Sequence, residues 1–120
     1  MKPTMVFVIF VAFGVFVVRP LTTFAAGQPC DRACLRTTMD AYLNAVVKHD
    51  PAGAPLAVGF RQTENAVVIR DGTGVWKTVT ALGAMQRRYF DPVSGQAAYF
   101  GVVEEGAEKA VVTVRVKIDD

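Results

Sequence analysis

Residues 30–51 read CDRACLRTTMDAYLNAVVKHDP, and this stretch decides the fold. Its large apolar side chains recur three or four positions apart, which is the spacing of one face of an α-helix. They are Leu35, Met39, Tyr42, Leu43, Val46 and Val47. Pro51 ends the pattern, because proline has no backbone N–H and disfavours a helical residue before it. The stretch predicts a helix of about five turns from Cys30 to His49, whose apolar face needs a broad apolar partner.

From Phe60 onward the apolar residues follow a period of two, which is typical of β-strands. The predicted strands are 63–70, 84–90, 96–104 and 111–118, and 75–82 is ambiguous between a short helix and a strand. Glycine-rich turn signals separate them. A long helix followed by hairpin-linked strands predicts an α+β fold, with the long N-terminal helix packed on a curved antiparallel sheet. A cavity between helix and sheet is where a functional site is expected.

The first 27 residues have the pattern of a secretory signal peptide. Lys2 supplies a positive start, and residues 5–18 (MVFVIFVAFGVFVV) contain no charge. A spanning helix needs roughly 20 apolar residues, and Arg19 ends this run early. We therefore expect a cleaved signal peptide at 1–27, one domain at 28–120, and a secreted or periplasmic protein. An uncleaved membrane anchor is the alternative.

Charge and composition exclude several classes of partner. The chain has 13 basic and 11 acidic residues, and loss of Lys2 and Arg19 with the leader leaves 11 against 11. A neutral domain lacks the positive surface that nucleic acid or an anionic membrane requires. Gly72-x-Gly74 lacks the lysine of a phosphate-binding loop, and the single histidine lies far from the two cysteines, so no cofactor and no metal is expected.

Six short motifs follow one another along residues 30–104, and their order is informative. They are CDRACL at 30–35, DxYL at 40–43, HDP at 49–51, RxTEN at 61–65, GxGVWxT at 72–78 and GQxxxFGVVE at 95–104. In this order they resemble the secreted SnoaL-like proteins of the nuclear transport factor 2-like superfamily, over about residues 30–118. The resemblance implies a cone-shaped SnoaL-like barrel with a pocket at its open end. It implies little about chemistry, because that superfamily contains both enzymes and binding proteins.

The chain departs from this family pattern in two ways. Such proteins usually carry a further strand after 111–118, whereas this chain has only Asp119 and Asp120 there. The last strand is therefore expected to be missing, which leaves 111–118 as an apolar edge. Either a partner chain covers that edge or the reading frame is truncated. The acid–base groups of the family's enzymes, an Asp with a Tyr or paired His, have no evident counterpart.

Cys30 and Cys34 are expected to form a disulfide. Four positions along a helix place both on one side with Cα atoms about 6 Å apart, within disulfide reach. Export to an oxidising compartment favours the bond. Free thiols are the alternative.

His49 and Glu64 are the candidate catalytic residues. His49 carries an imidazole, which could act as a general base, or it could simply complement the negative end of the helix. Glu64, if buried in a pocket, would be a stronger base. Its alternative is a solvent-facing carboxylate paired with Arg61 or Arg70.

The candidate ligand-binding residues are mostly aromatic or amide side chains with polar tips. They are Tyr42, Asn65, Trp76, Arg87, Tyr89 and Tyr99. Arg87 and Arg88 must point to opposite faces of a strand. We predict that Arg87 points inward, as an anion clamp, while a surface ion pair is its alternative.

Three functions follow from these patterns. The favoured one is an exported domain that binds a small, mostly apolar molecule in its cavity, without established catalysis. The second is a dehydratase, isomerase or hydrolase with Glu64 or His49 as base and Tyr89 or Tyr99 as hydrogen-bond donor. The third is a homodimer or partner-binding module that pairs through its exposed last strand.

Overall fold

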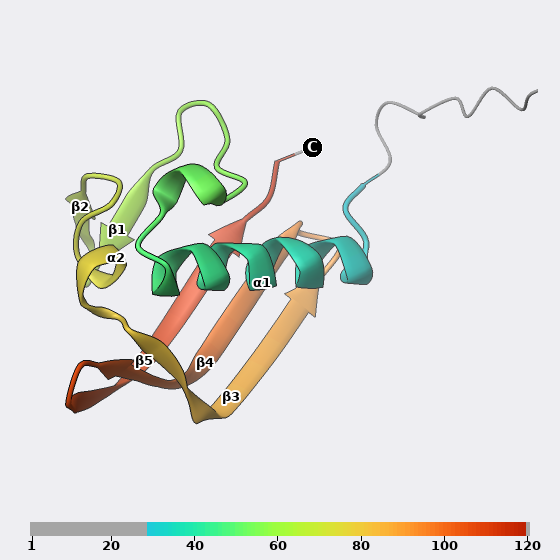
Figure 1. Cartoon of the computed structure of the whole chain (residues 1–120). Helices are drawn as coiled ribbons and strands as arrows, with labels where there is room; N and C mark the ends of the chain where they lie inside the picture. Colours follow the sequence, from blue (N-terminus) through green and yellow to red (C-terminus); the bar gives the residue numbers. More distant parts are fainter. Residues whose placement is uncertain (1–28, 120) are drawn as a thin grey trace, which may run out of the picture.

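The computed structural model describes residues 29–119, and the predicted signal peptide lies outside them. Helix α1 (Arg32–Val47) packs on an antiparallel sheet in the order β3 (Ala81–Asp91), β4 (Gln96–Glu105), β5 (Glu108–Lys117) (Figure 1). This arrangement confirms the prediction of an α+β domain with its N-terminal helix on antiparallel strands. None of the helices between residues 29 and 119 is long and apolar enough to cross a membrane.

Helix α1 forms where its apolar spacing predicts it. The Asp31 side chain caps its start by accepting a hydrogen bond from the Cys34 amide at 2.8 Å, which satisfies one of the free N–H groups of the first turn. The helix ends at Val47, two residues before the predicted end, and His49 then takes a left-handed backbone with φ of 55°. Its buried residues are Leu35, Met39, Tyr42, Leu43, Ala45 and Val46.

The segment between helix and sheet differs from the prediction. After a short turn, η1 (Pro51–Gly53), the predicted strand 63–70 is a hairpin of β1 (Gln62–Glu64) and β2 (Val67–Ile69). The single-strand prediction was wrong because Asn65 and Ala66 adopt left-handed φ angles of 48° and 66°, which reverse the chain. The ambiguous stretch 75–82 divides into helix α2 (Val75–Thr78) and the start of β3.

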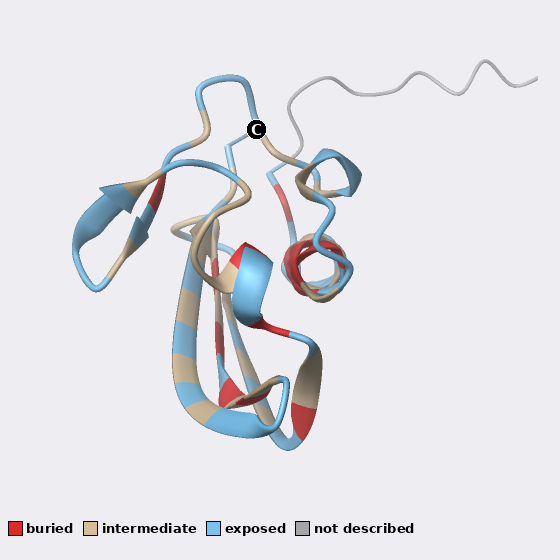
Figure 2. Ribbon diagram, turned by 60° about the vertical axis from the view of Figure 1, so that its left-hand side comes forward, coloured by how far each residue is buried: buried red, intermediate tan, exposed pale blue. Residues whose placement is uncertain are grey.

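The two sheets are separate and do not close into a barrel. The β1–β2 hairpin stands apart from the three-stranded sheet (Figure 2), and no backbone pairing joins them within the described part of the chain. The closed cone that the family resemblance implies is therefore not formed by residues 29–119. Both β3 and β5 are edge strands of the larger sheet.

The core lies between α1 and the inner face of β4. Leu35, Met39, Trp76 and Tyr99 are the largest side chains with almost no solvent exposure. An ion pair reinforces the contact, since Arg88 Nε on β3 donates to Asp40 Oδ1 on α1 at 2.7 Å. The Arg88 guanidinium also lies 5.5 Å from the centre of the Tyr99 ring.

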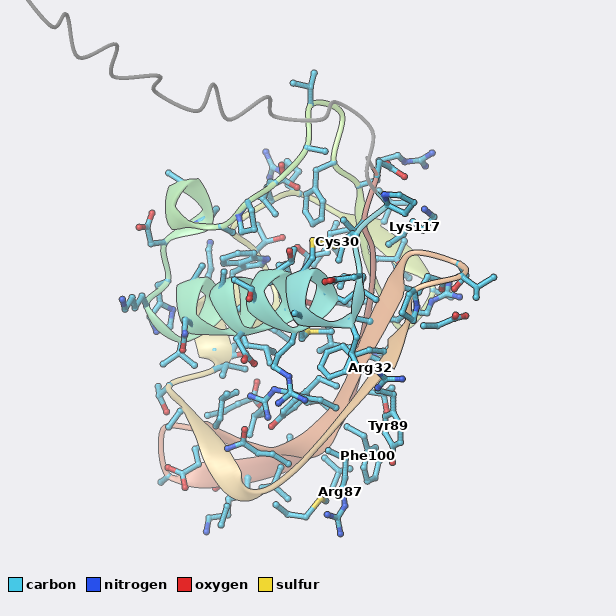
Figure 3. The ribbon with its side chains drawn as sticks, turned by 90° about the vertical axis from the view of Figure 1, so that its right-hand side faces the viewer. Cys30, Arg32, Arg87, Tyr89, Phe100 and Lys117 are labelled. Atoms are coloured by element: carbon cyan, nitrogen blue, oxygen red, sulfur yellow. A yellow bond between two sulfur atoms is a disulfide. The ribbon has the colours of Figure 1, made fainter. Side chains whose placement is uncertain are left out.

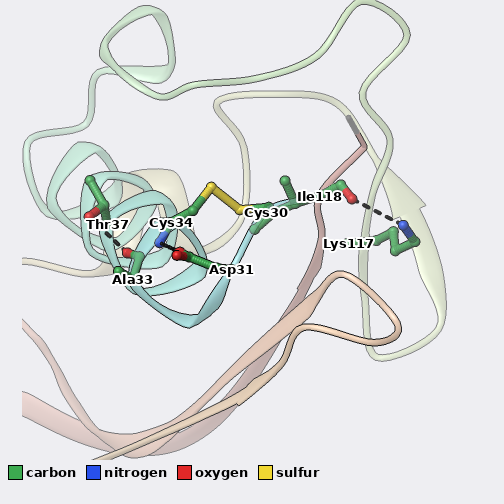
Figure 4. The surroundings of a disulfide bond; sticks show 7 residues. All are labelled: Cys30, Asp31, Ala33, Cys34, Thr37, Lys117 and Ile118. Carbon is green, nitrogen blue, oxygen red and sulfur yellow. Dashed lines mark hydrogen bonds between the residues drawn. A yellow bond between two sulfur atoms is a disulfide. The ribbon is translucent and has the colours of Figure 1, made fainter. Parts of the chain in front are cut away.

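A disulfide joins Cys30 and Cys34, whose Cα atoms are 5.3 Å apart, as the spacing predicts. Figure 4 shows the bond beside Ile118, at the end of β5. The double variant Cys30→Ser/Cys34→Ser is expected to lose about 2 kcal/mol of unfolding free energy, because so short a loop restricts the unfolded chain only modestly. Urea unfolding followed by Trp76 fluorescence measures this. Wild-type protein under reducing conditions should match the variant, and equal stability of oxidised wild type and variant would contradict the prediction.

Candidate functional site

A groove of about 1100 Å³ lies between the edge of β5 and residues 55–65, and we call it the β5 groove. Residues 111–119 form one wall, residues 55–65 form the other, and Tyr42 and Val75 lie between them. Its half-buried apolar side chains are Leu56, Phe60, Val75, Val112, Val114, Val116 and Ile118. Pockets for small molecules usually measure about 300–1,000 Å³, so this groove is at or above the upper limit.

The β5 wall of the groove carries unpaired backbone. The Ile118 amide donates to the Gly95 carbonyl at 2.9 Å, and β4 and β5 keep one register from Gln96–Lys117 to Glu105–Glu108. In an antiparallel sheet, every second residue of a strand hydrogen-bonds to the neighbour on one side, and the residues between them direct their N–H and C=O groups to the other side. The even-numbered residues of β5 therefore bond to β4. The odd-numbered ones turn their N–H and C=O groups away from β4, along the free edge: Lys109, Val111, Thr113, Arg115 and Lys117. All of them except Lys109 line the groove.

The two faces of β5 differ in chemistry. Val112, Val114 and Val116 point toward the core and are half-buried, although each lies on an edge strand. The alternating residues on the other face are exposed, and Val111 keeps 66% of its surface accessible. A strand beside β5 would therefore meet an apolar inner row and a polar, basic outer row.

A hydrogen-bonded network supports the opposite wall. Trp76 Nε1 donates to Gln62 Oε1 at 2.6 Å, and Gln62 Nε2 donates to Glu64 Oε1 at 3.1 Å. The same Glu64 oxygen accepts the Val75 amide at 2.8 Å. Gln62 is buried, so these bonds satisfy a polar group that would otherwise be costly to bury. The network ties β1 to α2.

Tyr42 joins this network to the groove. Its ring packs edge-on against Trp76 with centroids 5.3 Å apart, and it lines the groove. Burial, and then the nearby Glu64 charge, raises the pKa of Tyr42 to about 12. Its hydroxyl therefore stays protonated at neutral pH and is available as a hydrogen-bond donor.

Both catalytic candidates bond to α2. Glu64 lines the groove and accepts the Val75 amide. His49 lies outside the groove lining, and its Nδ1 is 2.6 Å from the Trp76 carbonyl oxygen. Because a carbonyl only accepts, this Nδ1 carries a proton and donates it. The structure thus gives each candidate a stabilising partner.

The candidate ligand-binding residues do not converge on one site. Tyr42 and Asn65 line the β5 groove. Trp76 and Tyr99 are core residues with 1% and 0% exposure. The remaining two are Arg87 and Tyr89, which lie on the sheet face away from α1 (Figure 3).

The prediction that Arg87 points inward was wrong. Arg88 takes the inner face, because α1 places the Asp40 carboxylate there as its partner. Strand alternation then sends Arg87 outward. The sequence shows that the two arginines face opposite ways, but it does not show where Asp40 lies.

Gln62 and Thr113 are features of the groove that the sequence patterns did not single out. Nothing near Gln62 marks it as buried, because its burial depends on Trp76, 14 positions away. Thr113 had a weak signal, since it lies in the alternating run of the last strand.

The fold and the groove define a small α+β domain with an open groove beside an unpaired strand edge. No family model, no curated protein and no solved structure matches this chain. The resemblance to SnoaL-like proteins therefore stays a prediction. Among residues 29–119, no three His, Cys, Asp or Glu side chains form a group that could hold a metal ion.

Proposed function

We propose that this protein is an exported, non-catalytic binding module that takes an extended polypeptide segment along the free edge of β5. The observation that carries the proposal is the row of backbone N–H and C=O groups of alternate β5 residues that borders the groove. An added strand would satisfy these groups with main-chain hydrogen bonds, which is a common mode of peptide recognition. It would also widen the sheet toward β1, closer to the cone that the family resemblance implies.

A small, mostly apolar molecule is the second candidate ligand. Leu56 and Phe60 favour it, because both are half-buried side chains in the groove lining. Such a molecule would leave the edge of β5 without hydrogen-bond partners. The size of the groove and its open side also favour an extended segment over a compact molecule.

Binding without catalysis is supported by the environment of the candidate bases. Glu64 and His49 bond to the backbone of α2, and His49 lies outside the groove lining. A secreted or periplasmic location is supported by the Cys30–Cys34 disulfide, because such bonds persist in oxidising compartments.

A proline at Thr113 provides the test. The Thr113 amide points to the groove, so Thr113→Pro removes a donor from the free edge and leaves the β4 ladder intact. Thr113→Val, which keeps the N–H, is the matched control. The probes are labelled peptides of about nine residues, enough to span β5 at ~3.4 Å per residue. They carry valine on one face and glutamate, threonine or lysine on the other.

We expect saturable binding of at least one peptide to wild type and to Thr113→Val, and a loss of roughly tenfold or more in Thr113→Pro, by analogy with other lost main-chain hydrogen bonds. Circular dichroism and urea midpoints check that both variants fold. Binding that is unchanged in a folded Thr113→Pro, or absent for every peptide, would overturn the proposal. Saturable binding of the apolar dye anilinonaphthalene sulfonate, with no peptide binding, would favour the second candidate.

A further inference from the structure

The charged side chains around the β5 groove are not balanced. The lining contains three basic side chains (Arg61, Arg115 and Lys117) and two acidic ones (Glu64 and Asp119). Lys117 pairs with Asp119 at 3.4 Å, and Glu64 accepts bonds from Val75 and Gln62. Within residues 29–119, neither Arg61 nor Arg115 has a carboxylate partner. Two cationic groups, one on each wall, are thus left for a ligand.

From this imbalance we infer that the segment bound along β5 is acidic, with carboxylates on its outward face and apolar side chains on its inward face. The inference rests on the proposed function, since it names the chemistry of the strand that β5 accepts. In a cross-strand pair, side chains directly opposite lie about 4.5–5.5 Å apart at Cβ. A carboxylate opposite Arg115 would replace its present neutral partner, the Gln96 amide oxygen at 3.3 Å.

The inward-facing valines of β5 determine which side chains the bound segment carries on its inward face. Side chains that alternate with the carboxylates would fall beside Val112, Val114 and Val116 and face Leu56 or Phe60 across the groove. Burial of apolar side chains there contributes affinity, while the outer carboxylates contribute selectivity. The bound segment thus alternates apolar and acidic residues.

A second copy of this chain is a poorer occupant. Hydrogen bonding across two β5 edges pairs odd-numbered residues with odd-numbered residues. Two antiparallel registers of β5 against β5 meet this condition and overlap over almost the whole strand. One places Lys109 opposite Arg115 of the copy, and the other places Lys109 opposite Lys117 of the copy. Like charges directly opposite destabilise a strand pair. The occupant is therefore a different polypeptide.

The test compares the glutamate peptide with the lysine peptide, each with the same valine face, on the mature protein. The glutamate peptide is expected to bind roughly tenfold more tightly at low salt, and the difference should shrink at roughly 0.5 M salt. Arg115→Glu should reverse the preference. Arg87→Glu is the matched control, because it makes the same charge change at an exposed site on β3, outside the groove.

The outcomes separate this inference from the function on which it rests. Equal binding of both peptides that is lost in Thr113→Pro would overturn the acidic preference and leave strand addition standing. A preference for lysine, or an equal effect of Arg87→Glu and Arg115→Glu, would also overturn it. A dimer in sedimentation that disappears in Thr113→Pro would replace the acidic partner with a second copy. Absence of binding by every peptide would overturn both proposals.

Discussion

Replacement of Trp76 by alanine is expected to lower the free energy of unfolding by about 3–5 kcal/mol. Trp76 is 1% exposed, packs against Tyr42, and donates its indole N–H to Gln62. Alanine leaves a cavity beside α1 and removes the donor from a buried amide oxygen. In a domain of this size, such a loss is a large share of the total stability.

Urea unfolding followed by far-UV circular dichroism measures this effect, since the chain has one tryptophan and the variant has no fluorescence reporter. Trp76→Phe is the control. It keeps most of the volume but loses the N–H, so we expect it to cost about 1–3 kcal/mol for the unsatisfied Gln62. A loss below about 1 kcal/mol in Trp76→Ala would show that Trp76 is not part of the core.

The second large effect is expected at Gly74, at the start of α2. Its backbone has φ of 61° and ψ of −128°, a conformation that L-amino acids rarely adopt. A Cβ atom there would also overlap the Glu64 carboxylate. Gly74→Ala therefore combines about 1–3 kcal/mol of backbone strain with damage to the Glu64 bond to Val75, and we expect a total loss of roughly 2–5 kcal/mol.

A double-mutant cycle separates strain from overlap. In a Glu64→Ala background the overlap is removed, so Gly74→Ala should cost at least about 1 kcal/mol less than in wild type. Gly59→Ala is the control for strain alone, because Gly59 has φ of 82° and open space around its Cα. Trp76 fluorescence reports all these unfolding curves. If Gly74→Ala costs no more than Gly59→Ala, the contact between Glu64 and the Gly74 turn does not exist.

Both experiments examine the wall of the β5 groove opposite β5. Trp76 and Gly74 belong to α2 and its preceding turn, and their partners Gln62 and Glu64 belong to β1. The stability of this wall therefore depends in part on these specific contacts. Variants that loosen it should also weaken peptide binding.

Local patterns were sufficient for the elements with strong periodicity. The α1 face, the strands β3 to β5 and the Cys30–Cys34 bond could all be predicted, because each depends on residues close together in the sequence. The 63–70 segment could not. Its alternation resembles one strand. Asn65 is compatible with a left-handed turn, but the turn also needs Ala66 in that region, which alanine rarely adopts.

The candidate site could be predicted only in part. Tyr42, Glu64 and Asn65 line the groove, whereas Arg87 and Tyr89 lie on the far face of the sheet and Trp76 and Tyr99 fill the core. A polar tip or an aromatic ring indicates that a side chain is suited to a pocket. It does not indicate whether the folded domain has a pocket at that side chain's position.

The sequence by itself predicted the class of this domain: an amphipathic N-terminal helix followed by hairpin-linked antiparallel strands, with a short disulfide loop at the start of the helix. Periodicity specifies these because hydrogen bonding and side-chain direction repeat along a single segment. Only the tertiary structure decided which arginine faces inward, which polar groups are buried, and that the edge of β5 borders an open groove. These features depend on contacts between residues far apart in the chain, and packing selects those contacts from several that local patterns allow equally.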